Sequence, residues 1–199
     1  MVLLRLNDEG RLCLKGSVEN QVIETPLIKD VLLLIDTSGS MSGDKLSQAK
    51  NGAIDFSRSA TRGGYAAGLA IFGDRAAMVC DPIVQSNRFE EKAASVRVGM
   101  VGGSTDLAAG LDLAGKFKHL AAVVVVTDGM PNSSRDALRS AEVLKQKGID
   151  ILCIGTDDAD KEFLDQLATR KELAMHVEAG NLRASMGQAT QLLLGARHG

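Results

Sequence analysis

Residues 31–41, Val-Leu-Leu-Leu-Ile-Asp-Thr-Ser-Gly-Ser-Met, join a short apolar run to a cluster of oxygen-bearing side chains. Five apolar residues in a row, bounded by polar ones, are typical of a strand that is buried on both faces in a parallel sheet covered by helices. The run ends at Asp36, and Ser38 and Ser40 follow at alternate positions. Gly39 lets the backbone fold so that these three side chains converge. In an open α/β sheet such a loop lies at the carboxyl ends of the strands, where ligands usually bind.

A second fully apolar run, Ala121–Val126, also ends in a carboxylate, because Thr127-Asp128-Gly129 follows it. Between the two runs the chain carries a glycine-rich loop, Gly99–Ser104, and the next residue, Thr105, presents a hydroxyl. The two apolar strands are expected to bring Asp36 and Asp128 to the same end of one sheet. The sequence therefore predicts a cluster of oxygen groups at that edge.

Apolar strands alternate with amphipathic helices from residue 31 to residue 196, which predicts an α/β fold with a doubly wound, mostly parallel central sheet. Only three residues separate Ala66–Phe72 from Ala76–Cys80. Three residues cannot make a parallel crossover, so these two strands are expected to pair as an antiparallel hairpin at the edge of the sheet. Asp81-Pro82 is expected to end that pair.

The first 29 residues are expected to form an extension outside this sheet. Residues 2–6 and 11–14 flank Asn7-Asp8-Glu9-Gly10, which has the composition of a turn, so a β-hairpin is predicted there. An irregular polar stretch is expected from the hairpin up to Pro26. The predicted organisation is thus an N-terminal hairpin extension over residues 1–29 and one α/β domain over residues 30–199.

Composition narrows the class of protein. The chain has 199 residues, 45% of them hydrophobic, and a formal net charge of −2, which argues against nucleic acid or an anionic membrane as the main partner. The three cysteines are odd in number and widely spaced, with no Cys-x-x-Cys pair, and Cys153 lies in an apolar strand-like run where a buried thiol is expected. The first residues lack a basic region and no segment approaches 18 apolar residues, so neither a signal peptide nor a membrane span is expected. We therefore expect a cytoplasmic protein.

The pattern Asp36-x-Ser38-x-Ser40, followed by Thr105 and then by Asp128 at a strand end, resembles the metal-ion-dependent adhesion site (MIDAS) of von Willebrand factor type A (VWA) domains. All five residues match that motif in order and spacing, so the motif is complete, and the resemblance covers roughly residues 30–196. It implies that residues 30–199 form a VWA domain. It also implies that Ser38, Ser40 and Thr105 contact a metal ion directly, while Asp36 and Asp128 act largely through water.

The chemistry of this set indicates which ion would bind. Five oxygen ligands, with no imidazole or thiolate, favour Mg²⁺ or Mn²⁺ over Zn²⁺. Hydroxyl ligands are neutral, so the ion keeps its attraction for an anion, and a Glu or Asp of a partner protein is a natural occupant of an open coordination position. Without metal, Asp36 and Asp128 would repel each other.

The leading hypothesis is a non-catalytic, Mg²⁺-dependent protein-interaction module that binds an acidic residue of a partner. The resemblance implies an intracellular, prokaryotic type of VWA protein, such as an adaptor for AAA+ ATPases of the MoxR or chelatase kind or a component of a stress or conflict system. The alternative is a Mg²⁺-dependent phosphohydrolase with chemistry like that of the haloacid dehalogenases. That family needs a second carboxylate two residues after the first, and position 38 is a serine.

A second group of acidic residues can be interpreted in two ways: Asp157, Asp158 and Asp160. Helix capping and favourable interaction with the helix dipole explain these residues. If the predicted sheet is correct they also lie on the metal-bearing rim, where they could influence the choice of partner.

Overall fold

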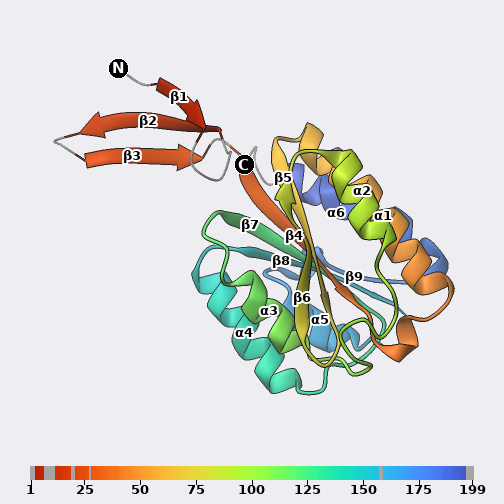
Figure 1. The fold of residues 1–199 in the computed structure, drawn as a ribbon. Helices are drawn as coiled ribbons and strands as arrows, with labels where there is room; N and C mark the ends of the chain where they lie inside the picture. Colours follow the sequence, from red (N-terminus) through yellow and green to blue (C-terminus); the bar gives the residue numbers. More distant parts are fainter. Residues whose placement is uncertain (1–2, 7–11, 19–20, 27, 157–158, 196–199) are drawn as a thin grey trace.

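A six-stranded mixed sheet forms the centre of the fold (Figure 1). The computed structural model describes residues 3–6, 12–18, 21–26, 28–156 and 159–195. The strand order is β6-β5-β4-β7-β8-β9, and every neighbouring pair is parallel except β5 and β6. The strands span Lys29–Asp36 (β4), Tyr65–Phe72 (β5), Ala76–Ile83 (β6), Leu120–Thr127 (β7), Asp150–Thr156 (β8) and Ala174–Val177 (β9). The predicted mostly parallel sheet with one antiparallel edge strand is confirmed.

The central strand is β4, which pairs in parallel with β5 on one side and β7 on the other. Every residue of β4 except Lys29 is buried. A strand with partners on both sides and helices over both faces has no solvated side, which explains its continuous apolar run. Because β4 and β7 are parallel neighbours, both end at the same edge of the sheet.

Helices cover both faces of this sheet, as Figure 1 shows. Helices α1, α2 and α6 lie on one face, and α3, α4 and α5 lie on the other. Their bounds are Asp44–Arg62 (α1), Ser86–Ala94 (α2), Leu107–Ala114 (α3), Ser134–Gln146 (α4), Lys161–Leu167 (α5) and Leu182–Gly195 (α6). The described residues also include three short 3₁₀ segments, at Gly39–Met41 (η1), Lys171–Leu173 (η2) and Ala179–Asn181 (η3). In the described part of the chain, no helix combines the length and the apolar character that a membrane span requires.

Strand β6 is longer than expected. The sequence predicted that Asp81-Pro82 ends the pairing with β5, but β6 continues to Ile83, which lies opposite Ala67. Proline removes a hydrogen-bond donor, and this is tolerated on an edge strand, where one side of the backbone has no neighbouring strand. The register between the two strands also shifts twice near this point.

The N-terminal segment forms a separate three-stranded antiparallel sheet, β1 (Leu3–Leu6), β2 (Leu12–Val18) and β3 (Gln21–Pro26). The predicted hairpin corresponds to β1 and β2, and its turn lies outside the described residues. The prediction of an irregular stretch up to Pro26 is wrong, because Gln21–Pro26 pairs with Cys13–Val18 along its whole length. β-Branched side chains at Val22, Ile23 and Thr25 favour such an extended conformation.

Candidate metal site

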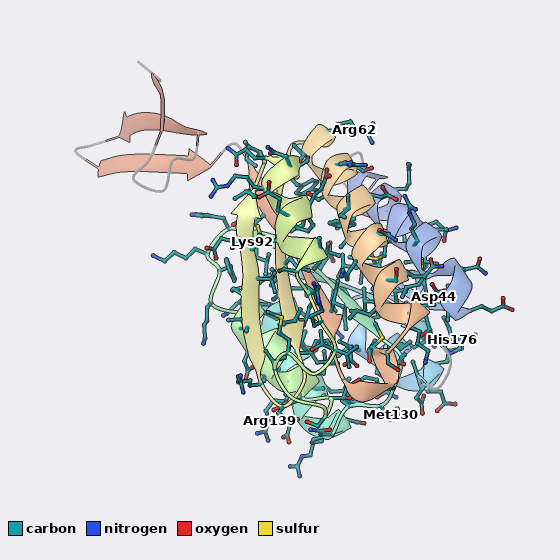
Figure 2. The ribbon with its side chains drawn as sticks, turned by 45° about the vertical axis from the view of Figure 1, so that its right-hand side comes forward. Asp44, Arg62, Lys92, Met130, Arg139 and His176 are labelled. Carbon is teal, nitrogen blue, oxygen red and sulfur yellow. The ribbon has the colours of Figure 1, made fainter. Side chains whose placement is uncertain are left out.

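Three loops meet at the edge of the sheet where β4 and β7 end. The loop after β4 is joined to the segment after α2 by the Gly99 N–H, which donates to the Thr37 carbonyl at 2.7 Å. It is joined to the glycine-rich loop before α3 by the Gly39 N–H, which donates to the Gly103 carbonyl at 3.3 Å. Asp44, at the start of α1, and Met130, after β7, lie toward this end of the molecule, while Arg62 lies toward the other (Figure 2). Backbone contacts therefore assemble the site from distant parts of the chain.

Asp36, the last residue of β4, is completely buried, and both its carboxylate oxygens accept hydrogen bonds. The Ser38 backbone N–H donates to Oδ1 at 2.8 Å, and the Thr127 hydroxyl donates to Oδ2 at 2.7 Å. Burial raises the pKa of Asp36, the bonds from Thr127 and Ser38 lower it, and the nearby Asp128 charge raises it; the net shift is upward. Asp36 is thus a desolvated carboxylate held by neutral donors.

Asp128 follows β7 directly and is also buried, but it forms an ion pair with a lysine side chain. Its Oδ2 accepts from the Lys45 ammonium at 2.6 Å, and its Oδ1 accepts from the Ser40 hydroxyl at 2.7 Å. The Ser40 Oγ lies 3.0 Å from the Ser38 Oγ. A continuous chain of contacts therefore runs from Asp36 through Ser38 and Ser40 to Asp128.

Thr105 lies on the neighbouring loop and is held through its backbone. Its N–H donates to the Asn132 Oδ1 at 3.1 Å, and its carbonyl accepts from the Asn132 N–H at 2.9 Å. Asn132 also donates from Nδ2 to the Ser104 Oγ at 3.1 Å, and Asp74 accepts from the Ser104 N–H at 2.9 Å. Among the described residues, the half-buried Thr105 side chain makes no hydrogen bond with the other four predicted ligands.

The distance between the Ser38 and Ser40 hydroxyl oxygens can be compared with the spacing of adjacent ligands around a metal ion. Adjacent ligands of an octahedral ion with metal–oxygen distances of about 2.1 Å lie roughly 3.0 Å apart, whereas calcium distances of about 2.3–2.6 Å require roughly 3.3–3.7 Å. The 3.0 Å between Ser38 Oγ and Ser40 Oγ is a hydrogen-bond distance, and it is compatible with the ligand spacing around a small octahedral ion. The donor set of hydroxyls and two carboxylates therefore suits a small, hard divalent cation.

Other candidate ligands do not gather in this way. Among the described residues, no group of three or more histidine, cysteine, aspartate or glutamate side chains could hold a metal. Asp160 caps α5, since its Oδ1 accepts from the Phe163 N–H at 3.0 Å, in line with the capping interpretation. Asp157 and Asp158 lie outside the described residues.

Sequence reasoning missed the residues that support the site: Lys45, Thr127, Asn132 and Asp74. The ion pair of Lys45 could have been predicted, because a lysine in the first turn of the helix after the loop lies within reach of the neighbouring strand end. The contacts of Thr127, Asn132 and Asp74 join segments 27 to 91 residues apart, and no periodic pattern marks such contacts.

Comparison with known families identifies the class of protein. The family model described as von Willebrand factor type A domain matches residues 30–188, and the chain belongs to this family. None of the curated proteins compared with the chain matches it.

Solved structures share the fold at low sequence identity. The proximal thread matrix protein 1 of the mussel byssus superposes with a TM-score of 0.73 and 20% identity, over 83% of this chain and 45% of that one. A second structure of that mussel protein, described as having a zinc-occupied MIDAS motif, gives a TM-score of 0.72 and 18% identity, over 84% and 46%. The von Willebrand factor domain of the pilus tip protein Mfa5 from Porphyromonas gingivalis gives 0.73 and 14%, over 84% and 95%. The chain spans about half the length of the mussel protein.

Proposed function

We propose that this protein is a non-catalytic protein-interaction module whose binding depends on Mg²⁺ or Mn²⁺. In this proposal the five residues form a complete MIDAS: Ser38, Ser40 and Thr105 contact the ion directly, and Asp36 and Asp128 contact it through water. The observation that carries the proposal is the linked set of oxygens from Asp36 to Asp128 at one edge of the sheet. The mussel relative with a zinc-occupied MIDAS motif supports a divalent ion at the corresponding place.

The partner is expected to supply a Glu or Asp to the ion. Neutral hydroxyls leave the charge of the cation incompletely balanced among its direct ligands, so an incoming carboxylate gains a strong electrostatic bond. Desolvation at the contact strengthens this bond, because the local dielectric constant falls as water leaves. Exposed apolar side chains at Val98 and Met100, next to Gly99, and at Met130 offer contact area around the site.

The geometry favours binding over the alternative phosphohydrolase chemistry. A nucleophilic aspartate must present an oxygen to the substrate, yet Asp36 is completely buried and both its oxygens accept hydrogen bonds. Ser38 replaces the second carboxylate that such chemistry needs as an acid and base.

The cellular setting remains part of the proposal. We propose a cytoplasmic, intracellular prokaryotic adaptor whose partner is a protein, such as an AAA+ ATPase of the MoxR or chelatase kind or a component of a stress or conflict system, rather than nucleic acid or a membrane. We also propose that residues 30–199 carry the binding function and that residues 1–29 are an extension.

Affinity capture from lysate of the source organism tests the proposal. The bait is the full chain with Mg²⁺, with EDTA, and as the Ser38→Ala variant with Mg²⁺. Ser42→Ala is the matched control, because Ser42 lies in the same loop, is exposed, and makes no side-chain hydrogen bond among the described residues. We expect specific capture by the wild type and the control in Mg²⁺ only, and its loss when one acidic residue of the captured protein is replaced. Equal capture of the partner in EDTA would show that the partner does not bind at the predicted metal site.

A further inference from the structure

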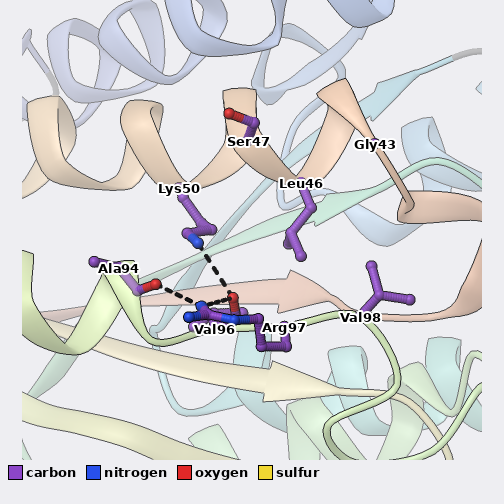
Figure 3. Close-up of a pocket in the computed structure, with 8 residues that line it drawn as sticks. All are labelled: Gly43, Leu46, Ser47, Lys50, Ala94, Val96, Arg97 and Val98. Carbon is purple, nitrogen blue, oxygen red and sulfur yellow. Dashed lines mark hydrogen bonds between the residues drawn. The ribbon is translucent and has the colours of Figure 1, made fainter.

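A surface pocket lies beside the candidate metal site, between the first turns of α1 and the segment that follows α2 (Figure 3). Its volume is about 340 Å³, and Gly43, Lys50, Arg97 and Val98 are among the residues that line it. Gly43 is three residues beyond Ser40, so the two Cα atoms are at most about 11 Å apart. Val98 precedes Gly99, whose N–H donates to the carbonyl of Thr37 in the loop after β4. The end of the pocket formed by Gly43 and Val98 therefore lies close to the loop that carries Ser38 and Ser40.

Two cations in this pocket share one neutral acceptor. The Lys50 ammonium donates to the Val96 carbonyl at 3.2 Å, and the Arg97 Nη1 donates to the same carbonyl at 2.9 Å and to the Ala94 carbonyl at 2.7 Å (Figure 3). Burial lowers the pKa of Lys50, and the charge of Arg97 lowers it further. Within the described part of the chain, neither cation has a carboxylate partner.

Two other arginines on the same face of the sheet have carboxylate partners. Arg58, on α1, donates to Glu90 of α2 at 2.8 Å, and Arg183, on α6, donates to Asp55 at 2.7 Å. The chain as a whole is slightly acidic, with a net charge of −2. Lys50 and Arg97 differ from these two arginines because they donate to backbone carbonyls instead of carboxylates.

The remaining donors of the pocket suit a carboxylate. Lys50 uses one of its three N–H donors on the protein, and Arg97 uses only Nη1, so the guanidinium keeps donors with the planar geometry that binds a carboxylate through two bonds. Leu46 and Val98 provide apolar surface for the methylene groups of a glutamate side chain.

We propose that this pocket binds a second carboxylate of the partner, so that the partner segment presents two acidic side chains, one to the metal and one to Lys50 and Arg97. This inference rests on the proposed function for its choice of partner. The partner is then an acidic peptide segment. A metal site alone accepts any suitably placed carboxylate, so the contact with Lys50 and Arg97 would distinguish among partners. Once one carboxylate is bound to the metal, the second is held near the pocket at a high effective concentration, which raises the overall affinity.

The test is an NMR titration of the full ¹⁵N-labelled chain in EDTA at constant ionic strength. The probe is N-acetylglutamic acid α-amide, which carries a single side-chain carboxylate, and a parallel titration uses inorganic phosphate. We expect saturable shifts at the amides of Val96, Arg97 and Val98. The dissociation constant is expected to rise roughly twofold to fivefold in Lys50→Gln and in Arg97→Gln. Lys92→Gln, at an exposed lysine of α2 outside the pocket, is the control and should bind like the wild type.

Several results would overturn the inference. Shifts that do not saturate, or that are unchanged in both pocket variants, would show that the pocket does not bind the probe. Tighter binding of phosphate than of the glutamate probe would show that the pocket recognises phosphate. Because EDTA removes the metal, these outcomes are independent of the metal site. Absence of pocket binding with an intact response to Mg²⁺ would reject this inference alone. Pocket binding without any response to Mg²⁺ would reject the proposed function and leave the pocket as a carboxylate site without the metal contact.

Discussion

The ends of β4 and β7 both place a buried carboxylate at the same edge of the sheet, but different groups hold the two carboxylates. Asp36 accepts from a backbone N–H and from the Thr127 hydroxyl, whereas Asp128 accepts from the Ser40 hydroxyl and the Lys45 ammonium. Asp128 therefore has a charge partner in the protein itself. Among the described residues, Asp36 accepts only from neutral donors, and its pKa is raised. Under the proposed function, Asp36 is therefore the carboxylate whose charge the cation balances.

The largest expected effect comes from removing the donor that holds Asp36. Thr127→Val leaves one buried carboxylate oxygen without its partner, which should cost about 1–3 kcal/mol of unfolding free energy. Thr156→Val is a matched control at the end of β8, because Thr156 is completely buried and its hydroxyl has no hydrogen-bond partner among the described residues. Chemical denaturation should show a clear loss for Thr127→Val and little change for Thr156→Val. Equal losses would mean that the Thr127 hydroxyl does not support Asp36.

A second experiment compares the two carboxylates directly in metal-free protein. Asp128→Asn removes the charge that Lys45 contacts and should cost about 1 kcal/mol. Asp36→Asn removes a desolvated charge, and the Thr127 hydroxyl can turn toward the Gly129 carbonyl, 3.4 Å away, so this variant should be at least as stable as the wild type. Thermal unfolding in EDTA measures the difference. A larger loss for Asp36→Asn than for Asp128→Asn would reverse the comparison.

Replacing the internal cation should sharpen the contrast. Lys45→Met keeps an unbranched apolar side chain and removes the ammonium that donates to the Asp128 carboxylate. Since Mg²⁺ no longer competes with a neighbouring positive charge, its affinity should rise by roughly threefold to tenfold, equivalent to about 1 kcal/mol. Isothermal titration calorimetry with Mg²⁺ gives the value. A lower affinity would show that Lys45 helps the cation to bind, for example by keeping the loop in place.

The smallest effect concerns pH. The pKa of Asp36 is raised above 3.8, so the folded protein binds this proton more tightly than the unfolded chain. The contribution of Asp36 to metal-free stability should therefore increase as the pH falls through the folded pKa and level off below about 3.8. Because Mg²⁺ competes with the same proton, its stabilising effect should shrink over that range. Thermal unfolding of wild type and Asp36→Asn at several pH values isolates this contribution, and identical pH profiles for the two proteins would contradict it.

The sequence alone predicted the sheet and the convergence of four of the five predicted ligands because both depend on local patterns. Buried parallel strands read as apolar runs, and their carboxyl ends share an edge, so Asp36, Ser38, Ser40 and Asp128 could be placed together before their contacts were known. The position of Thr105 depends on Asn132, which is 27 residues away, and no local pattern indicates that contact.

The errors in the prediction have related causes. Strand β3 was missed because the polar residues Gln21, Glu24 and Thr25 interrupt its apolar pattern, while its pairing with β2 decides the conformation. Strand β6 was ended too early because the restriction that proline imposes is weaker at the edge of a sheet than inside it. The ion pair between Lys45 and Asp128 joins a helix to a strand 83 residues later. In each case contacts between distant segments determine the structure.

The most direct test of the account is whether Mg²⁺ or Mn²⁺ stabilises the protein through Asp36. Chelator-treated protein is unfolded in a calorimeter with and without about 10 mM Mg²⁺, which for a millimolar dissociation constant adds roughly 1.4 kcal/mol by mass action. In a chain of this size the melting temperature should rise by about 3–6 °C in the wild type and stay unchanged in Asp36→Asn. No shift with either ion, or an equal shift in the variant, would contradict the proposal that these residues bind the metal.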